Sequence, residues 1–358
     1  MRVLVTGGAG FIGTHVCREL LERGHNVRVL DDFSTGHRAN LAGLRVQVVD
    51  GSVTDTRAVA AAVAGMDSVV HLAAVSSVPG SFARPYSTLE INTFGTGNVL
   101  AAATGVGAHV VVASSAAVYG DGPARQRTET ARPDPRSPYA VSKLAAELYA
   151  TAWQQAHAAR VLTFRLFNVF GPLQPADSGA VVPGFLAAVC AGVPLRILGD
   201  GTQVRDFVPV TMVAEVVAVA VERRLAHLTP VNLAAGRTTD LLQLIAHLED
   251  ILGRRLPREH SAVRAGDIHS SCADTTVLRQ LFPHVTAPPL GTALRKTLAW
   301  WQAGEGVIPA ATSVRPENMN TNASGFANAV DRLPDRLPVL PLKSNGPATL
   351  VPVRPPTV

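Results

Sequence analysis

The chain opens with a short apolar run that ends in a cluster of glycines, and this feature limits its folds more than any other. The segment VLVTGGAGFIG (3–13) reads as a β-strand, a tight turn and the start of a helix. Its glycines match the pattern GxGxxG from Gly8 and the wider GxxGxxG from Gly7. Small residues let the backbone approach a pyrophosphate, and a helix N-terminus points free N–H groups at the anion. The dinucleotide-binding residues expected in this turn are Gly7, Gly10, Phe11, Ile12 and Gly13.

An acidic residue follows the glycine turn at the spacing of a dinucleotide site. Asp31 lies 18 residues after Gly13, at the end of the second predicted strand. A carboxylate there accepts hydrogen bonds from the adenosine ribose and repels a 2′-phosphate, which favours NAD over NADP as the cofactor. The residues expected to flank the same ribose are Asp32, Ser34, Thr35 and Gly36.

The first two-thirds of the sequence alternate between apolar strand patterns and amphipathic helix patterns. Most strand candidates are continuous apolar runs, as expected for parallel strands that are covered on both faces. The predicted strands are Arg2–Thr6, Asn26–Leu30, Arg45–Val49, Ser68–Leu72, His109–Ser114 and Val161–Leu166. The predicted helices between them are Thr14–Arg23, Thr56–Ala64, Thr88–Thr104 and Pro138–Ala158. This alternation predicts an α/β fold, a Rossmann-type doubly wound parallel sheet with right-handed crossovers.

After residue 171 the pattern loosens, which predicts a smaller C-terminal lobe. We expect residues 1–171 to form the NAD-binding domain, with the chain returning to its sheet near 205–235, at Arg205–Val210 and Val231–Leu233. Residues 172–204 and 236–308 would form the lobe, with helices near Val182–Ala191, Thr239–Leu252 and Leu290–Trp301. The remaining segment, 309–358, holds nine of the 25 prolines and is predicted to be a disordered tail.

The composition argues against several classes of protein. Apolar residues make up 47% and charged residues 16% of the chain, which is enough for a large core. The net charge of +5 is scattered without a long basic run, so we expect no nucleic-acid partner. No apolar stretch is long enough to span a membrane. The three distant cysteines suit neither a disulfide framework nor a zinc site, so we expect a cytoplasmic protein without a metal.

A serine, a tyrosine and a lysine form the candidate reacting group. Ser137-Pro138 is typical of a helix start, and the helix that follows places Tyr139 and Lys143 on one face. A nearby ammonium and the positive nicotinamide of an oxidised cofactor would favour the tyrosine phenolate, which could then remove a proton from an alcohol. The spacing Tyr-x-x-x-Lys is weak evidence by itself. It gains weight because Ser115 follows a strand whose carboxyl end is expected to open onto the cofactor site.

With these segments in place, the chain resembles the extended short-chain dehydrogenases/reductases, and within them the NAD-dependent nucleotide-sugar epimerases and dehydratases, closest to the UDP-glucose (UDP-galactose) 4-epimerases. The resemblance runs from residue 1 to about residue 302. The motifs that carry it are TGGAGFIG (6–13), DDFSTGHRANL (31–41), HLAA (71–74), NTFGTGNVL (92–100), SSAAVYG (114–120), YAVSK (139–143), RLFNVFGP (165–172), GDGTQVRDFV (199–208) and RAGD (264–267).

The resemblance implies further site residues, and it assigns the lobe to a nucleotide sugar. Additional cofactor contacts are implied at Ser52, Val53, Leu72, Ala73, Ala74, Asn92 and Ser114, beside Tyr139 and Lys143. Ser52 departs from the family, which has an acid at this position next to the adenine. Substrate contacts are implied at Val78, Ser115, Ala116, Tyr139, Asn168, Val182, Phe185, Arg205, Arg264, Asp267 and Ser271. The two arginines match the diphosphate-binding arginines of the family.

Two alanines after the candidate active-site serine bear on which of the family's reactions this chain performs. The related dehydratases and decarboxylases carry an acid just after the active-site serine or threonine, where this chain has Ala116 and Ala117. Neither alanine can transfer a proton, so water elimination is disfavoured. A 4-epimerisation needs a single acid/base site and therefore remains. The alternatives are another NAD-dependent nucleotide-sugar dehydratase or oxidoreductase, and a non-catalytic NAD-binding protein.

The resemblance also bears on the sugar and on assembly. The residue that lines the sugar pocket in the epimerases is Ser271 here, and a small residue there accompanies use of N-acetylhexosamines. We therefore expect UDP-GlcNAc and UDP-GalNAc to be accepted beside UDP-glucose and UDP-galactose. Family members commonly pair as homodimers through the helices near 88–104 and 138–158, and we expect the same here.

Overall fold

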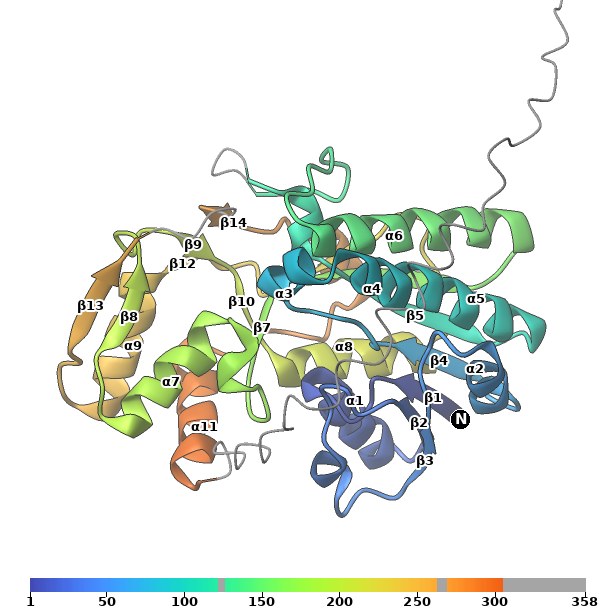
Figure 1. The fold of residues 1–358 in the computed structure, drawn as a ribbon, viewed down its shortest axis with the longest axis horizontal. Helices are drawn as coiled ribbons and strands as arrows, with labels where there is room; N and C mark the ends of the chain where they lie inside the picture. Colours follow the sequence, from blue (N-terminus) through green and yellow to red (C-terminus); the bar gives the residue numbers. More distant parts are fainter. Residues whose placement is uncertain (122–125, 263–268, 305–358) are drawn as a thin grey trace, which may run out of the picture. The chain divides into compact units, whose positions relative to one another are not determined.

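The computed structural model describes residues 1–121, 126–262 and 269–304. Its centre is a parallel sheet of seven strands in the order β11-β6-β5-β4-β1-β2-β3 (Figure 1). The bounds are β1 (Arg2–Thr6), β2 (Asn26–Asp31), β3 (Val46–Asp50), β4 (Ser68–His71), β5 (His109–Ser115), β6 (Val161–Leu166) and β11 (Val231–Leu233). The predicted fold class and the six predicted strands are thereby confirmed, with ends that differ by a residue.

Helices cover both faces of this sheet, as its continuous apolar strands require. On one face lie α1 (Phe11–Glu22) and α8 (Val210–Glu222), which pack against each other (Figure 1). The other face carries α2 (Thr56–Val63), α5 (Gly95–Gly105) and α6 (Pro138–His157). Each layer encloses its own buried apolar cluster. Helix α8 was not predicted, although its run of valines and alanines is buried over most of its length.

The helix predicted at Thr88–Thr104 is interrupted. The chain forms α3 (Val78–Ala83) and α4 (Pro85–Leu89), then a π-helical turn, η2 (Glu90–Phe94), before α5 begins. The Asn92 side chain lies in this turn, where it accepts a hydrogen bond from the Val75 N–H and donates to the Val75 carbonyl and the Ser142 hydroxyl. The π turn aims the amide at these partners, which the helical period of the sequence could not reveal.

The predicted return of Arg205–Val210 to the main sheet is wrong. Instead, β9 (Val204–Arg205) pairs with β12 (Thr239–Asp240) and β14 (Ser270–Ser271), and β10 (Phe207–Pro209) pairs with β7 (Asn168–Phe170). Asp206 between β9 and β10 is fully buried, and its carboxylate accepts hydrogen bonds from the Ala235 and Gly236 N–H groups. This carboxylate ties the segment to the loop after β11, so that only β11 extends the sheet.

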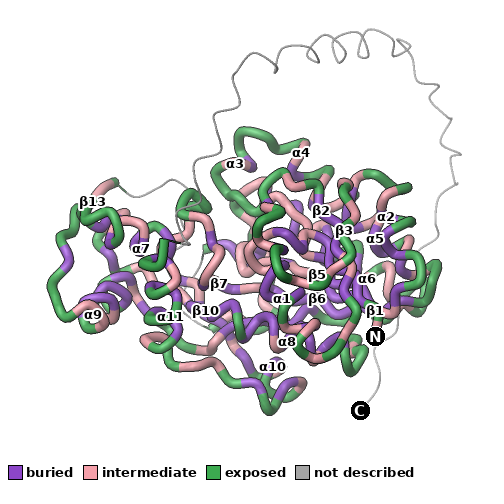
Figure 2. The backbone as a smooth tube through the Cα atoms, turned by 90° about the horizontal axis from the view of Figure 1, so that it is seen from below, coloured by how far each residue is buried: buried purple, intermediate pink, exposed green. Residues whose placement is uncertain are grey.

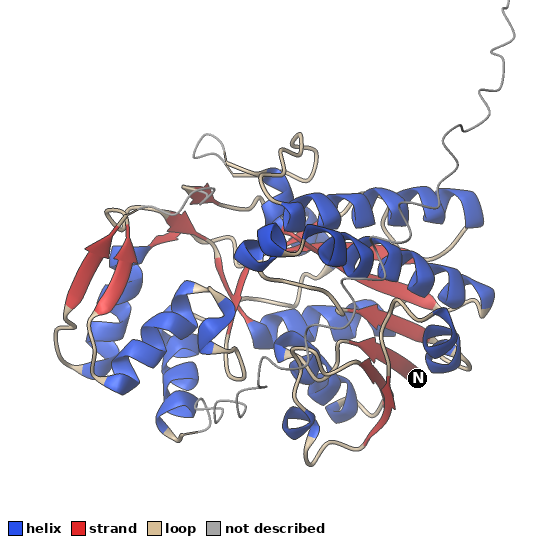
Figure 3. Cartoon of the chain, in the orientation of Figure 1, coloured by secondary structure: helices blue, strands red, loops and turns tan. Residues whose placement is uncertain are grey.

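A further buried cluster lies outside the sheet layers. It is formed by α7 (Val181–Ala191), α9 (Leu241–Leu252) and α11 (Leu290–Gln302) with β8 (Leu195–Leu198), which pairs with β13 (Arg258–Ser261). Figure 2 shows buried residues along these helices, and Figure 3 shows the two-strand ribbon beside them. Short elements complete the fold: η1 (Arg38–Leu41), η3 (Ala116–Tyr119), η4 (Ala176–Ser178) and α10 (Thr276–Leu281). The predicted tail, 309–358, lies outside the described residues.

Across the described ranges, no helix is both long and apolar enough to cross a bilayer.

Candidate functional site

A cleft of about 230 Å³ opens at the carboxyl ends of the central strands. The strand order reverses between β1 and β4, and a doubly wound sheet binds its ligand at such a switch point. Most predicted cofactor residues line the cleft, namely Gly7, Gly10, Phe11, Ile12, Gly13, Asp31, Asp32, Ser34, Thr35, Gly36, Val53, Leu72, Ala73, Ala74, Ser114, Tyr139 and Lys143. The fold therefore gathers residues from the first 143 positions of the chain around one hollow.

The glycine turn forms the floor of this cleft. Gly7 has a positive φ of 69°, and a Cβ on Gly13 would lie 2.1 Å from the Gly7 carbonyl oxygen. Gly10 is the N-cap of α1 and brings no side chain to cap the helix. The first N–H groups of α1 are therefore left for an anion. Such a cradle of small residues, which a Cβ would fill, fits the pyrophosphate of a dinucleotide.

Asp31 links the glycine turn to the second strand. Its two carboxylate oxygens accept hydrogen bonds from the Ala9 N–H at 2.8 Å and the Phe33 N–H at 2.9 Å. Burial raises the pKa of Asp31, and the two backbone bonds oppose that rise. Each oxygen keeps a free lone pair, so the carboxylate can still accept from a ribose hydroxyl. Beside it, Asp32 is exposed and caps its own turn by accepting from Ser34.

Two predicted cofactor residues do not line the cleft. The Ser52 hydroxyl bonds Thr54 instead, at 2.9 Å. Asn92 is 1% exposed, and its amide clamps the loop after β4 to α6. Sequence reasoning also missed several lining residues: Leu30, Gly51, Val75, Ser76, Ile91, Ala113 and Leu166. Leu30, Gly51, Ala113 and Leu166 lie at or next to the carboxyl ends of strands, which is the signal that could have found them, whereas Ile91 lies in η2.

Tyr139 and Lys143 line the cleft, and Ser115 contacts Tyr139. Tyr139 lies in the first turn of α6, where the Ser137 hydroxyl caps the helix by accepting from the Ala140 N–H. The Ser115 hydroxyl, at the end of β5, is hydrogen-bonded to the Tyr139 phenol. Lys143 is 6% exposed, and its ammonium donates to the Ala113 carbonyl at 2.8 Å. A helix and a strand thus bring together three groups that can bind and move a proton.

The structure does not bear out the expectation that the Lys143 ammonium favours the Tyr139 phenolate. Burial raises the pKa of Tyr139, and among its neighbours the Ser115 hydroxyl opposes the rise. Burial lowers the pKa of Lys143 to about 8, while the charge of Glu147 acts in the opposite direction. Burial thus favours the neutral phenol over the phenolate. Of the two positive charges invoked from the sequence, that of an oxidised nicotinamide is the one that must favour the phenolate.

The predicted substrate residues are distributed over several elements. Arg205 on β9 lies in register with Ser271 on β14, so these two positions are neighbours. Asn168 on β7 donates to the Asp206 carbonyl at 3.3 Å. Val78 begins α3, Ala116 begins η3, and Val182 and Phe185 are buried in α7 within the lobe cluster. Arg264 and Asp267 lie outside the described residues.

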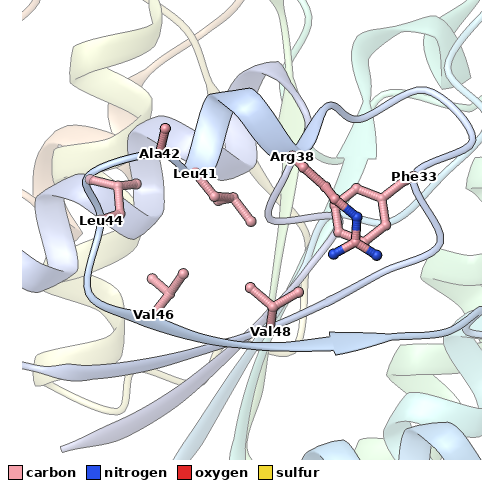
Figure 4. A pocket seen from close by; sticks show the side chains of 7 residues that line it. All are labelled: Phe33, Arg38, Leu41, Ala42, Leu44, Val46 and Val48. Atoms are coloured by element: carbon pink, nitrogen blue, oxygen red, sulfur yellow. The ribbon is translucent and has the colours of Figure 1, made fainter.

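A separate apolar hollow lies between η1 and β3. Figure 4 shows the Arg38 guanidinium stacked on the Phe33 ring, at 4.0 Å from its centroid, beside Leu41, Val46 and Val48. Arg38 also forms an ion pair with Asp50. This hollow holds none of the predicted site residues.

Comparison with known proteins bears directly on this cleft. Residues 3–234 match the family described as the NAD dependent epimerase/dehydratase family. The chain belongs to this family. The match covers the glycine turn, Asp31, the Ser115–Tyr139–Lys143 group and β11. NAD is therefore the cofactor of this protein, and the cradle around the glycine turn fits it.

Individual relatives carry out different reactions on nucleotide sugars. A UDP-glucuronic acid decarboxylase 1 of Xenopus tropicalis is 28% identical over 84% of this chain and 72% of its own length. The UDP-glucose 4-epimerase of Thermotoga maritima, solved with UDP-glucose, superimposes with a TM-score of 0.80 at 30% identity, over 85% of this chain and 99% of that one. A dTDP-glucose 4,6-dehydratase of Streptomyces venezuelae, solved with NAD bound, gives 0.80 at 31% identity, over 86% and 98%. The protein is thus an enzyme of nucleotide-sugar chemistry.

Proposed function

We propose that this enzyme is an NAD-dependent 4-epimerase of a nucleotide-linked hexose, with UDP-glucose and UDP-galactose as substrates and UDP-GlcNAc and UDP-GalNAc accepted beside them. The observation that carries the proposal is the composition of the short helix η3. Ser115 caps this helix, and Ala116 and Ala117 follow it directly. The alanines leave Tyr139 as the proton-transferring group of this segment, which suits a reaction that uses one acid/base group in both directions.

The proposed roles follow from the geometry at the inner end of the cleft. Tyr139 takes the proton from the sugar 4-hydroxyl and later returns it. Ser115, which is hydrogen-bonded to the Tyr139 phenol, would also hydrogen-bond the sugar oxygen O4. Lys143 adds a positive charge to the cleft wall, and the oxidised nicotinamide of bound NAD would supply the charge that favours the phenolate. NAD, when bound, accepts a hydride from C4 and gives it back. Because the cofactor ends in its starting state, the enzyme needs no added NAD during turnover.

The substrate would extend from Tyr139 towards the segments around β9. We propose that Arg205 and Arg264 bind the diphosphate, that Asp267 contacts the nucleoside ribose and that Asn168 holds the sugar-diphosphate. Ser271, beside Arg205, leaves space for an N-acetyl group. The lobe built on α7, α9 and α11 would carry the nucleobase contacts near Val182 and Phe185.

A dehydratase or another oxidoreductase is the second candidate, because both a dehydratase and a decarboxylase are among the relatives. Incubation of the purified protein with UDP-GlcNAc and with UDP-glucose, without added cofactor, separates the two when followed by proton NMR. An epimerase yields the 4-epimer at unchanged mass. A product lighter by one water, or NAD left reduced, would assign the second reaction.

The Tyr139→Phe variant tests the assignment of the base. It removes one hydroxyl from the buried ring and leaves the glycine turn intact. We expect turnover to fall at least 100-fold, in line with the loss of a general acid/base group, with the NAD content of the protein retained. Turnover close to wild type in this variant would contradict the role of Tyr139.

We also propose that two copies pair through the surface formed by α3, α4, η2 and α6. These elements pack side by side, and Figure 1 shows them on one flank of the sheet. The large exposed apolar side chains on them are Val78, Phe82, Tyr86, Leu89, Phe94, Val141, Leu148 and Tyr149. Several large apolar side chains exposed on helices that pack together are typical of a protein–protein interface.

A further inference from the structure

A buried ion pair lies directly behind the cleft. Glu147 follows Lys143 by one turn of α6, and the residue is 2% exposed. Its carboxylate accepts a hydrogen bond from the Ser114 hydroxyl on β5. On β6, the Arg165 guanidinium donates to both carboxylate oxygens, with Nη2 at 2.8 Å from Oε2 and Nε at 3.0 Å from Oε1. Glu147 therefore touches a residue of the cleft wall and is held by a second strand.

Arg165 is fixed in turn by groups beyond the cleft. Its Nη1 donates to the Tyr119 phenol oxygen at 2.9 Å and to the Glu129 carbonyl at 3.0 Å. The guanidinium carbon lies 4.7 Å from the centroid of the Tyr119 ring. Arg165 is 4% exposed, so none of these bonds competes strongly with water. The orientation of the Glu147 carboxylate is thus determined from both sides.

The charged groups around Lys143 indicate what the Glu147 carboxylate does. The ammonium donates to the Ala113 carbonyl on β5, and its charge acts on the imidazole of His71 on β4. His71 is neutral, because burial and the charge of Lys143 lower its pKa to about 3. Among the described residues, Glu147 is the anion that acts on Lys143, whose pKa of about 8 already lies close to neutral. Without the carboxylate, Arg165 would lose its buried ion-pair partner and Lys143 the anion that raises its pKa.

We propose that Glu147 is a positioning residue of the reaction: anchored by Arg165, it keeps the Lys143 side chain charged and holds the end of β5 that presents Ser115. The part of this inference that concerns turnover rests on the proposed function. The part that concerns the charge of Lys143 does not. A carboxylate that served only to attach α6 to the sheet would stabilise the fold and leave the charge of Lys143 unaffected.

The sequence offers a direct way to observe this charge. The chain contains only three lysines, Lys143, Lys296 and Lys343, so ¹³C-labelled lysine gives three NMR signals, assigned with Lys296→Arg and Lys343→Arg. In Glu147→Gln, which keeps the size of the side chain, we expect the titration midpoint of Lys143 to fall by one pH unit or more. An unchanged midpoint in the folded variant would overturn the proposal.

Glu249→Gln is the matched control. Glu249 on α9 is also buried, and its carboxylate accepts hydrogen bonds from Arg255 at 2.7 Å and Arg258 at 3.0 Å. It belongs to the lobe cluster region and has no contact with α6 or the cleft in the described structure. Loss of a buried acid there is expected to leave the Lys143 midpoint at its wild-type value. An equal shift in both variants would also overturn the proposal.

Turnover supplies the second readout. In wild type, activity is expected to fall as pH rises and Lys143 loses its proton. In Glu147→Gln this fall should begin at least one pH unit lower, with turnover at least about fivefold lower at pH 8 and with KM and bound NAD within twofold of wild type. If the NMR midpoint shifts but neither protein epimerises the sugar, the proposed function fails and the role of Glu147 in charging Lys143 stands.

A second variant, expected to shift the Lys143 midpoint in the opposite direction, tests the proposal if Glu147→Gln does not fold. Arg165→Gln removes the competing cation and leaves the Glu147 carboxylate to Lys143. The midpoint of Lys143 should then rise by half a pH unit or more. A midpoint that falls or stays constant in this variant would contradict the proposed coupling.

Discussion

The glycine turn after β1 illustrates what a single residue decides here. At Gly13, an added Cβ would meet the Gly7 carbonyl oxygen at 2.1 Å and the Gly8 Cα at 2.7 Å. Both contacts are with backbone atoms of the turn itself, so the turn must open to admit a methyl group. The same turn directs the N–H groups of α1 into the cleft. Packing and cofactor binding therefore depend on the same missing side chain.

Gly13→Ala is expected to abolish copurification of NAD and to lower the free energy of unfolding by about 1–3 kcal/mol, as overpacking usually does. Nucleotide released on denaturation and urea unfolding measure the two effects. Gly105→Ala is the control, because a Cβ at that helix-terminal glycine would meet no atom within 4 Å. Wild-type NAD content in Gly13→Ala would contradict the assigned role of the turn.

At the scale of the element, α6 positions Tyr139, the proposed acid/base group, in its first turn. The Ser137 hydroxyl accepts from the Ala140 N–H at 3.1 Å and so closes the turn that carries Tyr139. Serine before proline made this helix start predictable from the sequence. The interruption of the neighbouring helix at η2 was not predictable, because it depends on bonds from Asn92 to Val75 and Ser142, residues distant in the chain.

Ser137→Ala is expected to cost about 1 kcal/mol of stability by loss of the cap, and to reduce turnover several-fold by loosening the turn that holds Tyr139. Asp55→Ala removes the N-cap of α2, where the carboxylate accepts from the Arg57 and Ala58 N–H groups. This control should lose similar stability and keep wild-type turnover. Unfolding curves and initial rates, measured on both variants, check the difference; equal rates in the two would speak against the role of the cap.

The whole molecule couples its stability to pH through buried imidazoles. His109 at the start of β5 is 1% exposed and hydrogen-bonded to the Leu225 carbonyl at 2.7 Å. Burial lowers its pKa to about 4, against about 6.5 in the unfolded chain. Because the folded-state pKa is the lower one, the unfolded chain binds the proton first as pH falls. The stability that this neutral imidazole provides is present above pH 6.5 and is lost between about pH 6.5 and 4.

His109→Gln should therefore reduce the slope of unfolding free energy against pH, by up to about 1.4 kcal/mol per pH unit between pH 6 and 5. Urea unfolding at pH 7, 6 and 5 measures the slope. Other buried groups such as His71 and Asp206 are common to both proteins and cancel in the comparison. The exchange His284→Gln, at an exposed site, is the control and should retain the wild-type slope. If the curves of unfolding free energy against pH for His109→Gln and wild type ran parallel, His109 would not be the source of the pH dependence.

The exposed apolar face predicts the assembly of the whole molecule. Tyr86 is 88% and Phe94 65% exposed in one chain, and a homodimer would cover them. The double variant Tyr86→Arg/Phe94→Arg should convert a dimer into a monomer in light scattering, without loss of helical structure. A wild-type protein that elutes as a monomer at micromolar concentration would disprove the proposed pairing.

What the sequence by itself determined is the local part of this enzyme. The glycine turn, Asp31 eighteen residues later, the strand-and-helix alternation and the Tyr139–Lys143 spacing all depend on short stretches of chain, where periodicity and residue type report directly on structure. The tertiary structure alone decided that Glu147 meets both Ser114 and Arg165, and that β9 and β10 leave the main sheet. Both features depend on contacts between segments far apart in the chain, which form only when the strands and helices have packed. No local sequence pattern encodes which residue will be the partner of a buried charge.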